Sequence, residues 1–285
     1  MSILTRLLIS SRPISWINTV FPFAASYYFL GGELNVFFWI TSFFFFIPYN
    51  LLMYGINDVY DYESDLRNPR KGGLEGGLLP PELHTPTLWT SFLVSAPFIF
   101  FIAASSVENA LALAAFLGTI FFVVAYSIKG LRYKEIPFLD SFSSSIHFVG
   151  PAIFAVALFG DFSFEILIAL LAFFLWGAAS HAFGAVQDIR ADREAGIASI
   201  ATVLGARSTV RFALALYLVA ALLLILLPGR FMFAALAAIP YLIVVGRSLS
   251  ITDETCEDAN KGWKLFIGLN FLAGAIISSL LIGPV

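Results

Sequence analysis

The feature that most restricts the fold is a series of nine apolar stretches, each long enough to cross a bilayer as a helix. Soluble domains carry about a quarter charged residues, whereas this chain has 12% charged and 59% hydrophobic residues. The mean hydropathy is +0.89. We therefore predict an all-α integral membrane protein with nine transmembrane helices in one bundle. The predicted helices are 14–31, 36–55, 88–105, 109–127, 138–159, 164–185, 208–227, 231–247 and 263–282.

The connections between these helices differ strongly in positive charge. If the N-terminus is cytoplasmic, the external connections contain one cation, Arg230, and the internal ones and the N-terminus hold the other fifteen of the sixteen. Cytoplasmic loops are enriched in Lys and Arg, so we expect a multi-pass protein of the cell membrane with a cytoplasmic N-terminus and an external C-terminus. Most acidic residues also fall at cytoplasmic connections. We therefore expect the active site at the cytoplasmic side of the lipid bilayer. We expect no nucleic-acid partner.

The long cytoplasmic connections, about 56–87 and 186–207, follow the second and the sixth predicted helix. That offset of four helices suggests two related four-helix halves plus a ninth helix. No linker or separate soluble region interrupts the pattern. We expect a single domain over residues 1–285.

The connection after the second predicted helix contains a dense acidic segment, NDVYDYESD. Asn57, Asp61 and Asp65 are spaced at i, i+4 and i+8, so on a helix they share one face. Asp58 is a further candidate ligand or a partner of the ligands. Oxygen-only ligands on one stripe suit a hard divalent cation such as Mg²⁺. A solvated acidic loop between two hydrophobic helices is the alternative.

A second acidic pair follows the sixth predicted helix, in the segment QDIRADREAG. Asp188 and Asp192 lie one helical turn apart, with Arg190 and Arg193 beside them. Surface ion pairs of little energetic weight are the simplest explanation of such a pattern. Two acid pairs at cytoplasmic helix ends nevertheless favour another hypothesis. Facing each other, they would hold Mg²⁺ ions and through them a diphosphate.

A third internal connection supplies cations that suit phosphate binding. Its alternative role is to set the topology and contact lipid headgroups. Two more cations follow the first acidic segment, on a Gly-rich stretch that is either a mobile cap or a flexible connection. The predicted diphosphate-binding residues are Tyr126, Lys129, Arg132, Lys134, Arg70 and Lys71.

These segments together resemble the UbiA-type intramembrane prenyltransferases. The first family motif, N-[DQ]-x-x-D-x-x-x-D, matches Asn57 to Asp65, and the second, D-x-x-x-D with a following Gly, matches Asp188 to Gly196. The family segment Y-S-x-x-x-x-R-x-K matches Tyr126 to Lys134. The continuation through Asn68, Pro69, Arg70 and Lys71 is most similar to the lycopene elongase branch.

The resemblance implies Mg²⁺-dependent transfer of a prenyl group, such as dimethylallyl, from an allylic diphosphate to a hydrophobic acceptor such as lycopene, in carotenoid biosynthesis. The implied catalytic residues are Asp61, Asp65, Asp188 and Asp192, and the implied metal ligands are the same four with Asn57 and Asp58. Aromatic rings on inner faces of the first, second, fourth and fifth helices would line the cavity that protects the allylic cation.

Other acceptors and another class of protein stay open. A quinone precursor, another aromatic compound or a lipid alcohol is the alternative acceptor, and a cation transporter is the alternative class. Transporters tend to keep acids near the bilayer midplane, which these helices do not. We interpret His147 and His181 as packing or hydrogen-bonded groups, and TDETCEDAN, residues 252–260, as a solvated turn.

Overall fold

The structure is a computed structural model, and it describes residues 3–66 and 78–282. All regular structure in these ranges is helical, which agrees with the predicted fold class. The chain forms two compact units: unit 1 is Met1–Tyr133 with Gly150–Gly160, and unit 2 is Lys134–Val149 with Asp161–Val285. One long helix, α8 (Leu139–Phe159), contributes its first half to unit 2 and its second half to unit 1.

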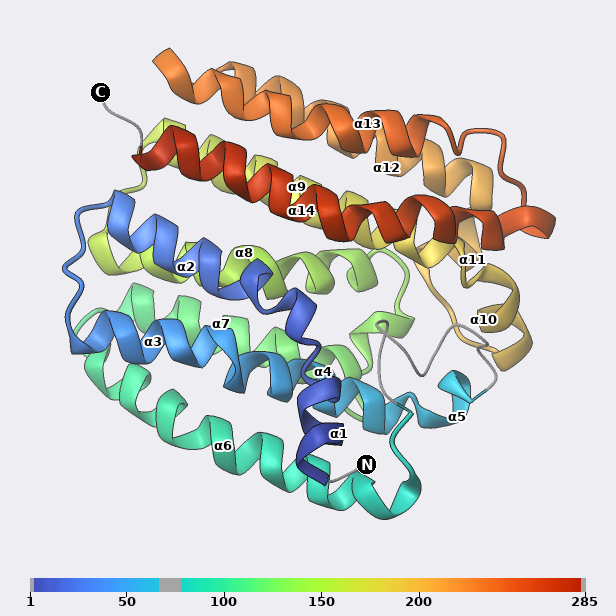
Figure 1. Cartoon of the computed structure of the whole chain (residues 1–285), viewed down its shortest axis with the longest axis horizontal. Helices are drawn as coiled ribbons and strands as arrows, with labels where there is room; N and C mark the ends of the chain where they lie inside the picture. Colours follow the sequence, from blue (N-terminus) through green and yellow to red (C-terminus); the bar gives the residue numbers. More distant parts are fainter. Residues whose placement is uncertain (1–2, 67–77, 283–285) are drawn as a thin grey trace. The chain divides into compact units, whose positions relative to one another are not determined.

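Unit 1 is built around α4, which contacts α1, α3, α6 and α7, while α2 packs against α3 (Figure 1). The helices of unit 1 are α1 (Ile3–Ser10), α2 (Ile17–Phe29), α3 (Val36–Phe46), α4 (Pro48–Tyr60), α5 (Tyr62–Asp65), α6 (His84–Ser105) and α7 (Ala110–Ser127).

A single predicted helix, 36–55, is two helices in the structure. The Asn35 side chain accepts a hydrogen bond from the N–H of Phe38 and starts α3. The break falls at Ile47, because Pro48 lacks an N–H and begins α4 at its first position. After the break α4 runs on to Tyr60, and it therefore carries the first half of the acidic segment as helix.

The core of unit 1 is a cluster of aromatic rings. Phe23, Phe45, Phe116 and Phe154 come from four different helices and are fully buried. Their ring centroids lie 5.2–6.4 Å apart, as in offset or edge-to-face aromatic pairs. These are rings of the predicted helices that were expected to line a cavity, and here they pack on one another.

In unit 2, α12 packs against α9 and η4, and α14 packs against η4, α13 and α9. Gly184 of α9 permits close approach of α14, since a Cβ there would lie 2.9 Å from the Trp263 ring. The elements after α8 are α9 (Phe164–Val186), α10 (Ile189–Ala195), α11 (Ile200–Leu204), α12 (Ala206–Ile225), η4 (Gly229–Ala238), α13 (Ile239–Gly246), η5 (Asp253–Asp258) and α14 (Ala259–Ile282).

Eight helical segments of the described chain are long and apolar enough to cross a membrane. They correspond to eight of the nine predicted spans. The other, 14–31, contains α2, whose 13 residues are short for a complete crossing. The span predicted at 231–247 begins as the 3₁₀-helix η4 and becomes α-helical only at Ile239, where Pro240 occupies a first-turn position.

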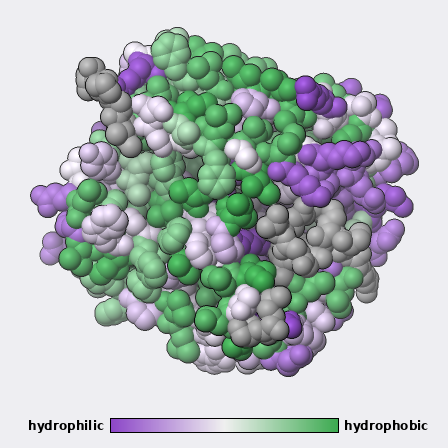
Figure 2. All heavy atoms as spheres, in the orientation of Figure 1, coloured by the Kyte–Doolittle hydropathy of each residue, from purple (hydrophilic) through white to green (hydrophobic). Residues whose placement is uncertain are grey.

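The surface fits a membrane environment. Large apolar side chains such as Trp39, Trp89 and Phe100 are more than half exposed, which is costly in water but favourable against lipid tails. Figure 2 shows hydrophobic side chains over much of the visible face, and hydrophilic ones gathered on the side where Figure 1 places α10 and α11. The chain is thus an integral, multi-pass helical protein.

Candidate active site

The first acidic segment keeps its helical spacing from α4 into α5. The N–H of Asp61 donates to the carbonyl of Asn57 at 2.9 Å, and the N–H of Asp65 donates to that of Asp61 at 2.8 Å. Asn57, Asp61 and Asp65 therefore remain one helical turn apart on one face, as the sequence predicts. A loop would not hold the three side chains in this row.

The carboxylates of this row are buried, and one of them lies near a cation from the third connection. Asp61 is 9% exposed and Asp65 7%. Arg132 places one terminal nitrogen 3.6 Å from Asp61 Oδ1, and its other terminal nitrogen donates to the carbonyl of Tyr60 at 3.2 Å. Arg132 is one of the predicted diphosphate-binding residues, and the structure places it next to the predicted metal ligand Asp61.

Asp58 points to different partners from those of the row. Ser10 Oγ donates to Asp58 Oδ2 at 2.8 Å, and Arg12 donates to Oδ1 at 3.2 Å. The Arg12 guanidinium also lies 4.2 Å from the centre of the Tyr54 ring, a cation–π contact. Burial is the largest single influence on the pKa of Arg12 and would lower it, but the charge and hydrogen bond of Asp58, together with Tyr54 and the charge of Asp65, raise the pKa above its ordinary value. Arg12 is therefore fully charged.

Sequence reasoning missed Ser10 and Arg12. The available signal was weak: a serine and a cation directly before Pro13 and the first apolar stretch, more than forty positions from Asp58. A buried carboxylate needs a partner, but the sequence does not say which cation supplies it.

The end of α7 also contacts the first segment. Ser127, which is fully buried, donates from Oγ to Asn57 Oδ1 at 3.2 Å. Its neighbour Tyr126 is half-buried in the last turn of the same helix. Lys129 is exposed just beyond it. Lys134 lies in η3 (Tyr133–Glu135) and belongs to unit 2. The predicted residues Arg70 and Lys71 lie outside the described residues.

The second acidic pair lies on a short helix in unit 2. Asp188 precedes α10 as its N-cap, and Asp192 is inside it, with its N–H donating to the Asp188 carbonyl at 2.8 Å. Gly196 ends the helix in the left-handed conformation, with φ of 70°. The N–H of Ile197 then returns to the Asp192 carbonyl at 2.8 Å, which closes a Schellman-type end. Both side chains are half-buried and one turn apart, as predicted.

Unit 2 also contains a buried acid with a structural role. Asp140 is fully buried, and its two oxygens accept from the N–H of Ser141 at 2.6 Å and from that of Ile200 at 2.7 Å. It joins the start of α8 to the start of α11. Next to it, Ser141 Oγ lies 3.0 Å from Nδ1 of His181, so His181 is a hydrogen-bonded group, as interpreted from the sequence.

The donor set fits a hard divalent cation. Carboxylate and amide oxygens on one helix face are ligands that Mg²⁺ prefers. Within residues 3–66 and 78–282, no group of three or more His, Cys, Asp and Glu side chains is arranged as a metal site. The Asp61 carboxylate lies near the guanidinium of Arg132. A positive charge, whether from a bound metal ion or from a guanidinium, offsets the repulsion between buried acids.

Comparison with known proteins places these features in a family. The model of the UbiA prenyltransferase family matches residues 19–273. A lycopene elongase/hydratase from Corynebacterium glutamicum is 48% identical over 279 residues, covering 97% of this chain and 96% of that protein. The C(50) beta-cyclic carotenoids biosynthesis protein LbtBC of Dietzia sp. (strain CQ4) is 50% identical over 99% of this chain, which spans 66% of its length.

A solved structure shows the same fold. The UbiA homolog from Archaeoglobus fulgidus, bound to DMAPP and Mg²⁺, superposes with a TM-score of 0.64 at 18% identity, over 95% of this chain and 99% of that one. The family match and the two relatives cover nearly the whole chain. The protein therefore belongs to the UbiA prenyltransferase family and is an intramembrane prenyltransferase.

Proposed function

We propose that the enzyme transfers a dimethylallyl group from its diphosphate to lycopene, with Mg²⁺ as cofactor. The observation that carries the proposal is the row of Asn57, Asp61 and Asp65, whose two carboxylates are buried and of which Asp61 lies beside the cation Arg132. The identity of the acceptor rests on the relatives named for lycopene elongation and C(50) carotenoid biosynthesis. A quinone precursor, another aromatic compound or a lipid alcohol is the acceptor to test against it.

We assign the metal to two sets of oxygen ligands. They are Asn57, Asp61 and Asp65 from the first segment, and Asp188 and Asp192 from the second. Bound Mg²⁺ supplies Lewis-acid stabilisation of the diphosphate leaving group, worth several kcal/mol in typical cases. Asp58 was a predicted ligand too, but both of its oxygens already accept from Ser10 and Arg12. We therefore assign it to anchoring α4, beside the ligands.

Cationic side chains balance the charge that the diphosphate gains. Arg132 is placed for this because its guanidinium already lies 3.6 Å from Asp61. Three neighbours in the sequence are proposed to share the role: the hydroxyl of Tyr126, in the last turn of α7, and Lys129 and Lys134, which follow α7. Arg70 and Lys71 are proposed from the sequence alone.

The chemistry needs one bond to break and one to form. The carbon–oxygen bond of the allylic diphosphate breaks, and the diphosphate leaves with the electron pair. The terminal alkene of the acceptor donates its π electrons to the allylic cation, forming a carbon–carbon bond and a tertiary cation. That cation then loses a proton, or captures water and loses a proton. Apolar surroundings, such as the buried aromatic core of unit 1, exclude water from the reaction.

The topology is part of the proposal. We propose nine transmembrane helices in a single domain, as two four-helix halves plus a ninth helix, with a cytoplasmic N-terminus and an external C-terminus. The positive charges support this orientation, since fifteen of sixteen cations fall on one side of the predicted topology. The acidic segments fall on that same side.

The test is expression in a lycopene-producing host, with pigments identified by mass. We expect lycopene to be converted to products heavier by one or two five-carbon units, with or without water. Asp61→Asn and Asp192→Asn should leave lycopene unchanged. Unchanged lycopene with the inserted wild-type protein would reject this acceptor. A cation transporter would be favoured by two results together: no prenylated product with any acceptor class, and an ion flux that is lost in Asp61→Ala.

A further inference from the structure

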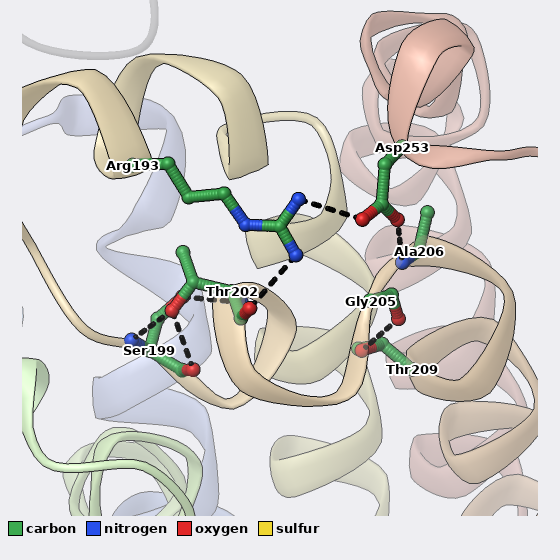
Figure 3. A network of polar contacts seen from close by, with 7 residues as sticks. All are labelled: Arg193, Ser199, Thr202, Gly205, Ala206, Thr209 and Asp253. Atoms are coloured by element: carbon green, nitrogen blue, oxygen red, sulfur yellow. Dashed lines mark hydrogen bonds and ion pairs between the residues drawn. The ribbon is translucent and has the colours of Figure 1, made fainter.

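The segment TDETCEDAN, which the sequence presents as a solvated turn, makes specific contacts in unit 2. Its first part is η5, and η5 packs against α10 and α12. Figure 3 shows Asp253 of η5 facing both Arg193 and the start of α12. Arg193 lies in the last turn of α10, one position after the proposed metal ligand Asp192.

Two side chains join four helical elements, α10, η5, α11 and α12. Arg193 donates from one terminal nitrogen to Asp253 Oδ2 at 2.6 Å, and from the other to the carbonyl of Thr202 at 2.9 Å. The second oxygen of Asp253 accepts from the N–H of Ala206 at 2.6 Å. Asp253 thus caps α12 while it binds α10, and Arg193 binds the end of α11. We call this pair the α10 clasp.

The surrounding backbone is built for this contact. Gly205 has a φ of 77°, and a Cβ there would lie 3.2 Å from Asp253 Oδ1, so a larger residue would crowd the carboxylate. Ser199 and Thr202 form a capping box that fixes the start of α11, and Thr209 donates to the Gly205 carbonyl at 2.8 Å (Figure 3). The partners of the clasp are therefore held in place by local hydrogen bonds.

The remaining contacts of α10 suggest why it needs the clasp. With seven residues, α10 is too short to be stable by its own hydrogen bonds. Ile189 is buried at its start. The other ion pair to η5, Arg190 with Glu257, is long at 3.6 Å, and both side chains are more than half exposed, so it contributes little. The clasp is the short, charge-assisted contact at the end of α10.

We propose that Asp253 is a positioning residue: through Arg193 it orients α10 and thereby the carboxylates of Asp188 and Asp192. This rests on the proposed role of those two residues as metal ligands. The clasp acts on the affinity for the metal–diphosphate complex rather than on bond breaking. Losing it should raise the Mg²⁺ concentration needed for half-maximal activity and leave kcat at saturating Mg²⁺ nearly unchanged.

The experiment measures prenyl transfer against Mg²⁺ concentration in purified protein returned to lipid vesicles. Asp253→Asn removes the charge but retains an oxygen for the Ala206 N–H, and Arg193→Lys retains the charge but loses the fork that reaches Thr202. We expect about a three- to tenfold rise in half-saturating Mg²⁺ for each, with kcat within about twofold. Asp253→Glu should recover part of the shift.

Asp258→Asn is the matched control. It removes the same charge from the same segment, but Asp258 pairs with Lys261 three residues away and not with α10. If Asp253→Asn and Arg193→Lys need no more Mg²⁺ than Asp258→Asn, the positioning role of the clasp is rejected. A fall in thermal midpoint with an unchanged Mg²⁺ requirement would also overturn it, since that is a purely structural role.

A further variant separates this proposal from the proposed function. Asp192→Asn should change the Mg²⁺ requirement more than any clasp variant. If it does so while the clasp variants do not, only the clasp is rejected. If Asp192→Asn retains the wild-type requirement, the metal role of α10 is rejected, and the positioning proposal with it.

Discussion

The two acidic segments share their spacing but are held in place by opposite means. In the first, Asp58 is fully buried and bound by Ser10 and Arg12, and Asp61 and Asp65 lie below 10% exposure. In the second, Asp188 and Asp192 are half-buried on a short helix, and the clasp side chains are 45% and 35% exposed. Buried ion pairs are hardly screened by solvent, whereas exposed ones are. The first segment is therefore held by buried contacts, whereas the clasp proposed to hold the second lies partly exposed at the surface.

The largest expected effect is common to both segments. Asp61→Asn and Asp192→Asn each remove one ligand charge at nearly constant shape. If both segments serve one metal–diphosphate complex, each should lower kcat/KM by about a thousandfold, as expected for the loss of several kcal/mol of leaving-group stabilisation. Steady-state rates with Asp258→Asn as control provide the check. A large loss in one segment with normal rates in the other would mean that only one segment binds the metal.

Stability should distinguish the segments next. Asp58→Asn leaves the Arg12 charge, whose side chain is only 18% exposed, without its partner, and breaking a buried pair costs about 3–5 kcal/mol. Asp253→Asn, in a partly exposed pair, should cost about 1 kcal/mol or less. Thermal midpoints in detergent measure both. Equal midpoints for the two variants would remove the distinction between a buried and an exposed anchor.

A double-mutant cycle sharpens that prediction. Arg12→Met should be strongly destabilising alone, because it leaves Asp58 charged and buried. The double variant Arg12→Met with Asp58→Asn should be more stable than the sum of the single changes, since no unpaired charge remains. Additive losses would show that Arg12 and Asp58 do not act as a pair.

A smaller effect is expected at the cation beside the first segment. Arg132→Lys keeps the positive charge but loses the planar fork that reaches both Asp61 and the Tyr60 carbonyl. We expect KM for the allylic diphosphate to rise about tenfold, with a lesser change in kcat. Arg247→Lys, the same substitution at an exposed position outside the proposed site, is the control and should change KM little. An unchanged KM in Arg132→Lys would place the diphosphate elsewhere.

The smallest effect should come from salt. Raising the ionic strength shortens the screening length to a few ångströms, so it weakens the exposed clasp more than the buried Arg12–Asp58 pair. Asp253→Asn lacks the clasp and so measures the general effect of salt. After correction for that effect, the half-saturating Mg²⁺ concentration of the wild-type protein should rise about two- to threefold. Parallel salt curves for both proteins would count against the comparison.

The parts that the sequence predicts are those governed by local periodicity. The spacing of Asn57, Asp61 and Asp65 follows from helical geometry, and the structure has it. The described chain also has membrane-length helical segments at eight of the nine predicted spans. What could not be predicted depends on contacts between distant segments. Arg12 meets Asp58 across 46 positions and Arg193 meets Asp253 across 60, and nothing in the local pattern marks those pairs.

Two further features could not be predicted, because hydropathy and composition do not record them. The break at Ile47 follows from Pro48, and the change from 3₁₀- to α-helix in the span at 231–247 falls at Ile239, next to Pro240. Hydropathy windows register neither, since they do not record a missing N–H. The aromatic rings expected around a cavity pack together in unit 1 because rings from four helices meet there, which composition alone does not show. The count of nine helices and their orientation stay predictions.

The most direct test of the central claim is prenyl transfer by the purified protein in lipid vesicles that contain lycopene, with dimethylallyl diphosphate added. With Mg²⁺ present, we expect lycopene products heavier by whole five-carbon units. Chelation of Mg²⁺ or Asp61→Asn should abolish them, and Asp258→Asn should not. If lycopene stays unchanged while an aromatic or lipid-alcohol acceptor is prenylated, the proposed acceptor is wrong. If product formation survives chelation, the proposed Mg²⁺ dependence is wrong.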